Sequence, residues 1–141
     1  ISNFSVGATA DNDIIKTDTA TDPTEAIAAA SDVQTTNATG NLTVATAATG
    51  LMLIGANMAG SFGDTGTLDG TNLLAALNGT MTVAANAEKV LVGIDNGVDT
   101  GVYFGSAGVG NAGVVATELT LIAVISGLSD ATTLTAANFT T

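Results

Sequence analysis

Residues 88–125, EKVLVGIDNGVDTGVYFGSAGVGNAGVVATELTLIAVI, hold the densest run of strand-forming residues in the chain. Val90, Val92 and Ile94 alternate with Leu91, which places them on opposite faces of a strand. A second alternation follows at residues 102–104, and the most apolar run, residues 119–126, comes after a glycine-rich loop. This pattern predicts three antiparallel strands, with the strand at 119–126 in the middle of the sheet.

The dipeptide Asn96-Gly97 separates the first two of these strands. Asn and Gly tolerate the positive φ angles at both centres of a tight hairpin turn, so we expect such a turn here. Asp95 and Asp99 flank the turn, where carboxylates and free backbone carbonyls would converge. This set of oxygens suits a hard cation such as calcium rather than catalysis.

Two further pairs of aspartates, Asp11 with Asp13 and Asp64 with Asp69, lie beside predicted turns. Their structural interpretation is that Asp11 and Asp13 accept hydrogen bonds in a solvated turn, and that Asp69 or Thr71 caps a short helix. Their functional interpretation is a loop that wraps a cation with carboxylate and hydroxyl oxygens. We predict calcium as the cofactor, with six candidate ligands: Asp11, Asp13, Asp64, Asp69, Asp95 and Asp99.

The composition favours a mainly β fold. Seventeen glycines, many threonines and a single proline are typical of strands separated by turns, and an aromatic content of only 4% leaves a core of small apolar side chains. We expect a β-sandwich or β-roll of roughly eight to ten short strands. The size predicts one β-rich domain over residues 1–141, with a weak subdivision near residue 50, where a more polar segment ends.

One or two short helices interrupt this pattern. The first is expected at residues 22–31, where Asp22 and Pro23 provide start signals before an alanine run. The second is expected at residues 71–78, where Asn78-Gly79 provides a stop signal.

Charge and missing residue types exclude several function classes. Thirteen acidic residues and only two lysines give a formal net charge of −11, whereas nucleic-acid binding needs clustered Lys or Arg, so no nucleic-acid partner is expected. No apolar run approaches the roughly 20 residues that span a bilayer, so no membrane insertion is expected. The chain contains neither Cys nor His, which leaves catalysis to carboxylates alone. We therefore expect a protein that is not an enzyme.

Several motifs occur in a recognisable order: KVLV at 89–92, the acidic Asn-Gly turn, DTGVY at 99–103, ELTLIAVISGL at 118–128 and LTAANF at 134–139. In this order, residues 88–139 resemble the carboxy-terminal domain of bacterial S-layer and RTX adhesin-like surface proteins, which are exported by type I secretion. The opening, ISNFSVGATADNDII, is similar to a segment that follows calcium-binding repeats in such proteins. The resemblance implies a secreted, self-associating β-domain with calcium as an expected ligand.

Two functions fit these observations. The first is an extracellular structural protein that self-assembles into a filament or surface layer and is stabilised by calcium. With two lysines and one proline to protect its strand edges, such a chain is expected to pair an edge with another copy of itself, and the apolar residues 1–6 are the expected donor strand. The alternative is a carboxy-terminal export and adhesion module of a larger type I-secreted adhesin, with cell-surface glycans or neighbouring cells as partners. Both functions place the protein outside the cell or on its surface.

Overall fold

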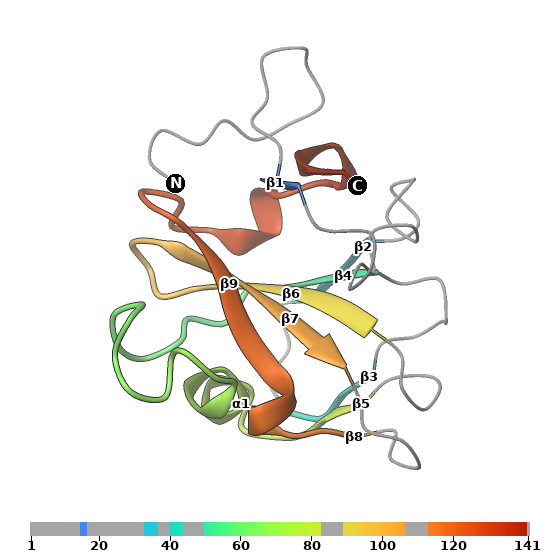
Figure 1. Ribbon diagram of the computed structural model, residues 1–141, viewed down its shortest axis with the longest axis vertical. Helices are drawn as coiled ribbons and strands as arrows, with labels where there is room; N and C mark the ends of the chain where they lie inside the picture. The colour runs from blue at the N-terminus through green and yellow to red at the C-terminus, as the bar shows by residue number, and fades with distance from the viewer. Residues whose placement is uncertain are drawn as a thin grey trace.

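The computed structural model describes residues 15–16, 33–36, 40–43, 50–82, 89–106 and 113–140. Over these ranges the chain forms ten strands, one α-helix and three short 3-10 turns (Figure 1). More of the described residues lie in strands than in helices, so the prediction of a mainly β fold with few helices is confirmed.

The strands of the described residues form three sheets. The largest sheet contains, in spatial order, β2 (Val33–Thr36), β4 (Leu51–Ile54), β6 (Lys89–Asp95), β7 (Thr100–Ser106) and β9 (Leu119–Ile125). The second contains β3 (Leu42–Thr43), β5 (Met81–Thr82) and β8 (Gly113–Val114). The third is a parallel pair of β1 (Ile15–Lys16) and β10 (Phe139–Thr140).

β6, β7 and β9 are antiparallel, as the alternation of apolar residues predicts. The side chains of Val90, Val92 and Ile94 pack on one face of the sheet, and Leu91 packs on the other. Tyr103, which lies opposite Val92 in the register, shares the face of Val92. The local pattern therefore correctly predicts the antiparallel run of these strands and which of their residues share a face.

β9 lies at an edge of the five-stranded sheet, so the prediction that it lies in the middle is wrong. The sheet extends instead beyond β6, where β4 and then β2 join in parallel. All four residues of β4 are fully buried, whereas β9 carries a bulge that leaves Ile122 unpaired and 45% exposed. An edge strand can be apolar because both of its faces are partly covered, so an apolar run does not determine a strand's place in a sheet.

One face of the five-stranded sheet packs against α1 (Thr71–Leu77) and the three-stranded sheet, which lie below it in Figure 1. We call this packing the first core. Its buried members are Leu42, Met52, Ile54, Met58, Leu73, Leu77, Met81, Val90, Val92, Ile94, Tyr103, Val114 and Leu119.

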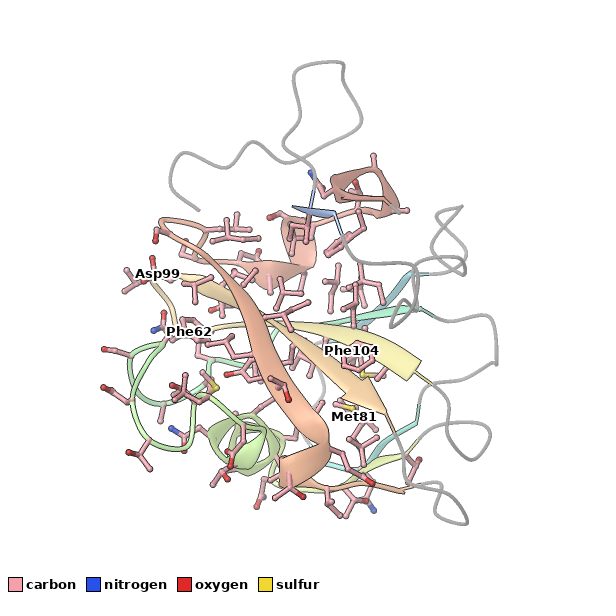
Figure 2. The ribbon with its side chains drawn as sticks, viewed as in Figure 1. Phe62, Met81, Asp99 and Phe104 are labelled. Carbon is pink, nitrogen blue, oxygen red and sulfur yellow. The ribbon has the colours of Figure 1, made fainter. Side chains whose placement is uncertain are left out.

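The other face packs against β1, β10 and the turns η4 (Ala131–Thr133) and η5 (Ala136–Asn138), above the sheet in Figure 1. The buried members of this second core are Ile15, Leu51, Leu53, Leu91, Val102, Ile125, Leu134 and Phe139. Figure 2 shows Met81 in the lower layer, and Phe104 packs against the second core. The five-stranded sheet is thus covered on both faces, with alternate residues of β4 and β6 feeding alternate cores.

α1 falls within the helix predicted at residues 71–78. Asn78 ends it in the left-handed region, with φ 51, and donates its backbone N–H to Ala75 O, as the Asn-Gly signal predicts. Gly79 then passes so close to the backbone of Gly40 that a side chain at this position would collide with it. The helix predicted at residues 22–31 lies outside the described residues.

Candidate functional site

The loop that joins β6 to β7 is wider than predicted. Asp95 pairs with Thr100, so four residues, 96–99, form the connection, and only Gly97 has a positive φ, of 83°. The predicted tight turn with Asn96-Gly97 at both centres is therefore wrong. The side chain of Asn96 accounts for the difference, because its Oδ1 accepts hydrogen bonds from Val98 N at 3.1 Å and Asp99 N at 2.8 Å. Asn96 acts as an acceptor that closes a four-residue loop.

Asp95 is the most buried carboxylate among the described residues, with 2% of its surface exposed. Its Oδ1 accepts from Gly97 N at 2.9 Å, and its Oδ2 accepts from Ala131 N at 3.2 Å. A buried carboxylate is stable only when such donors replace water, so both oxygens have a structural partner. Asp95 therefore ties the β6–β7 hairpin to η4, on the side of the second core.

Asp99, at the other end of this loop, makes a looser connection. Its Oδ1 accepts from Gly127 N at 2.8 Å, which joins the hairpin to the end of β9. Thr100 strengthens the same junction, because its hydroxyl donates to Leu128 O at 2.6 Å. Asp99 thus connects the hairpin to the end of β9 through one carboxylate oxygen.

The other two described candidates lie in the segment that connects β4 to α1, residues 55–70. Asp64 is exposed, and its Oδ2 accepts from Ser61 N at 3.0 Å. Asp69 Oδ1 accepts from Thr71 N at 2.9 Å just before α1, although the N-cap residue of the helix is Gly70. The backbone and side-chain hydrogen bonds from Thr71 hold the pKa of Asp69 below its ordinary value. Asp64 therefore stabilises a turn with one carboxylate oxygen, and Asp69 accepts hydrogen bonds from both the backbone and the side chain of Thr71 at the start of α1.

The segment 55–70 is held by a polar network that the sequence analysis did not identify. Thr67 is fully buried, and its hydroxyl donates to Asp64 O at 2.8 Å and accepts from Gly63 N at 3.0 Å. Tyr103 is also fully buried, and its hydroxyl donates to Thr67 O at 2.7 Å. Burial and the charge of Asp69 raise the pKa of Tyr103 above its ordinary value. Tyr103 thus anchors the segment from within the sheet.

Three more contacts fix the same segment against the sheet and the helix. Asn72 Nδ2 donates to Ala59 O at 3.1 Å, and Asn96 Nδ2 donates to Gly60 O at 3.0 Å. Phe62 packs directly over Gly101, close to the hairpin that carries Asp99 (Figure 2). The signal for this network in the sequence is weak, because a single Thr, Asn or Tyr becomes an anchor only when distant segments meet.

Four of the six candidate calcium ligands lie in the part of the chain that the structure describes. Asp95 and Asp99 lie on one hairpin and Asp64 and Asp69 on one connecting segment, whereas Asp11 and Asp13 lie outside the described residues. Across the described ranges, no three carboxylates gather into a group that could hold a metal ion. The four described candidates act as acceptors in turns, as the structural interpretation of such residues states. Calcium binding stays a prediction.

The outer edge of β9 carries the second candidate site, a surface for association. Residues 68–70 run alongside the start of this edge: Leu121 N donates to Leu68 O at 3.0 Å, Asp69 forms an antiparallel bridge with Thr120, and Gly70 N donates to Ala116 O at 2.9 Å. These contacts bring Leu68 beside Leu121, the neighbour of Ile122 in the chain, and Gly70 beside Ala116, the neighbour of Val115. Leu68, Val115 and Ile122 are apolar and 58%, 48% and 45% exposed. We call these three residues the edge cluster.

The comparisons with known proteins found no relatives. No family model matches the chain, and neither the curated proteins nor the solved structures contain a match. The resemblance to surface-protein domains therefore stays a prediction. Among the described residues, no helix has the length and apolar character needed to cross a membrane.

Proposed function

We propose that the protein is an extracellular structural protein that self-assembles through the outer edge of β9. The observation that carries this proposal is the edge cluster, because large apolar side chains gathered along one edge mark a surface for association. Three of the four large exposed apolar residues of the described chain belong to it. Composition is consistent with this proposal, since a chain without Cys or His lacks two of the commonest catalytic groups.

Charge determines the conditions under which copies can meet at this edge. Asp69 and Glu118 flank the edge cluster, and the whole chain carries a net charge of −11. Two copies that meet here bring like charges together, which opposes association at low salt. A divalent cation that binds these carboxylates would relieve the repulsion more effectively than monovalent salt. We therefore propose assembly that depends on calcium.

Electron microscopy of purified protein tests the proposal directly. We expect filaments or sheets in calcium, and smaller species in chelator or in sodium chloride of matched ionic strength. The double variant Leu68→Ser, Ile122→Ser should remain folded and fail to assemble, because it removes exposed apolar surface without touching either core. The matched control Val98→Ser changes an apolar residue of 63% exposure that lies in the 96–99 loop, away from the cluster, and should still assemble. A monodisperse monomer under every condition would rule out the structural role.

Calcium can also act inside the subunit, and this is tested separately. The carboxylates of Asp64, Asp69 and Asp99 are the described positions at which an ion would gain ligands. Ion binding to the folded state raises Tm by mass action. We expect calcium to raise the Tm of the monomeric double variant, and Asp99→Asn to reduce that increase. An identical Tm in calcium and chelator would assign these residues to turns alone.

Residues 1–6 lie outside the described residues, and their role as a donor strand remains part of the proposal. Deleting them should give folded monomers that no longer assemble if they link neighbouring subunits. Assemblies that persist unchanged would leave the edge cluster as the contact and remove the amino-terminal strand from the proposal.

A further inference from the structure

We propose that the parallel pair β1–β10 is a mechanical clamp that resists tension applied through the two ends of the chain. The inference rests on the proposed function only for the origin of the tension, because a donor strand at residues 1–6 that joined neighbouring subunits would transmit their pull into β1. The clamp itself is a property of the isolated fold, so it can be tested without assembly.

β1 and β10 run in the same direction, and this determines how tension between the chain ends loads them. Ile15 pairs with Phe139 and Lys16 pairs with Thr140, in parallel. The chain therefore enters β1 at one end of the pair and leaves β10 at the opposite end. Tension between the two chain ends pulls the strands past each other along their length, so both residue pairs carry the force together. An antiparallel pair would be pulled from one end, and its contacts would break one after another.

The packing of the pair adds resistance to this sliding. Ile15 is 6% exposed and Phe139 is 5% exposed, and both belong to the second core. Sliding the strands drags these side chains across the buried face formed by Leu51, Leu53 and Leu91. Shear thus disrupts apolar packing together with backbone pairing, although the pair is only two residues long. Figure 1 shows β1 beside the carboxy-terminal end of the chain.

Single-molecule force spectroscopy on the monomeric Leu68→Ser, Ile122→Ser variant tests the clamp. The chain has no Cys, so introduced cysteines provide unique attachment points. One geometry pulls from residues 1 and 141. The other pulls from residue 1 and from Thr133→Cys, an exposed site on the side from which the chain enters β10. The first geometry loads β1–β10 in shear, and the second separates it from one end. We expect a higher mean rupture force in the first geometry, and equal forces would overturn the clamp.

Two substitutions separate the clamp from general stability. Phe139→Ala should remove most of the difference between the two geometries, because it deletes the buried side chain of the pair. Leu134→Ala weakens the same core outside the pair, so it should lower the rupture force in both geometries and preserve their ratio. If Phe139→Ala does not fold, Phe139→Leu keeps the comparison, with a smaller loss. A ratio that falls equally in the Phe139 and Leu134 variants would assign the resistance to the core as a whole and overturn the proposal.

Discussion

The first face of the five-stranded sheet is covered mainly by residues 55–82, which follow β4 directly, whereas the second face is covered by residues 127–140, which follow β9, and by β1 from the opposite end of the described chain. The first cover is a connecting segment and a helix whose contacts include a buried hydrogen bond from Tyr103. The second brings Ile15 against Phe139 across most of the sequence. The second cover consists of a two-residue strand pair and short 3-10 turns rather than an α-helix, so we expect it to be the weaker of the two.

Matched leucine substitutions test this difference with the largest expected effect. Leu73→Ala removes a fully buried side chain from the first core, and Leu134→Ala removes one of 2% exposure from the second. We expect the free energy of unfolding to fall by about 4 kcal/mol for Leu73→Ala and about 2–3 kcal/mol for Leu134→Ala, because short 3-10 turns can relax into a cavity more completely than an α-helix. Urea denaturation measures both values. A larger loss for Leu134→Ala would reverse the ranking of the two faces.

A glycine substitution probes the first cover at its contact with the sheet. Gly101 has ordinary strand geometry, and Phe62 lies where its side chain would be. Gly101→Ala therefore has to displace Phe62, and we expect a loss of about 1–3 kcal/mol. In a Phe62→Ala background the same change should lose less than about 0.5 kcal/mol, because the ring is no longer there. Additive losses in this double-mutant cycle would show that Phe62 is not the group that Gly101 accommodates.

The anchor of the first cover also makes stability depend on pH. An unfolded chain ionises its tyrosine near pH 10, whereas the folded protein holds the proton of Tyr103 to higher pH because burial raises its pKa. The unfolded state thus loses a proton that the folded state keeps, so stability falls by about 1.4 kcal/mol per pH unit above about pH 10.

Tyr103→Phe is the matching variant. It should lose about 1–2 kcal/mol at neutral pH, because the Thr67 carbonyl loses its buried donor. It should also lack the steep fall in alkali that Tyr103 causes. Tyr103 is the single tyrosine of a chain without tryptophan, so tyrosinate absorbance reports this residue alone. Tyrosinate that forms near pH 10 while the protein remains folded would contradict the buried hydrogen bond.

The difference between the two faces also explains what sequence reasoning could predict. The antiparallel strands β6, β7 and β9 follow from local alternation, and the end of α1 follows from Asn78-Gly79. The place of β9 at the edge does not follow, because it depends on β4 pairing with β6, more than thirty residues away along the chain, and on β2 pairing with β4. Local patterns specify which side of a strand is buried, but its neighbours are chosen by long-range contacts.

The candidate site shows the same division. Turn positions for Asp64, Asp69, Asp95 and Asp99 could be predicted, because Asp next to Gly or Asn favours turns. Their partners could not. Asp95 accepts from Ala131 N and Asp99 from Gly127 N, and neither donor is identifiable before the carboxy-terminal residues are placed. Thr67 and Tyr103 are buried polar residues, and nothing in the local sequence indicates that the Tyr103 hydroxyl donates a hydrogen bond to Thr67 O.

The smallest expected effect on stability concerns a residue that belongs to neither cover. Ile122 lies at the bulge of β9 and is 45% exposed, whereas Ile125 in the same strand is fully buried in the second core. Ile122→Ala should lower the free energy of unfolding by less than about 1 kcal/mol, because nearly half of this residue is exposed in the monomer and it belongs to neither core. Ile125→Ala should lose about 2–4 kcal/mol, because it leaves a cavity. In sedimentation velocity with calcium, Ile122→Ala should nevertheless shift the population toward monomer. A loss above about 1 kcal/mol in Ile122→Ala would mean that the residue is covered within the subunit, and the edge cluster would then no longer be a surface for association.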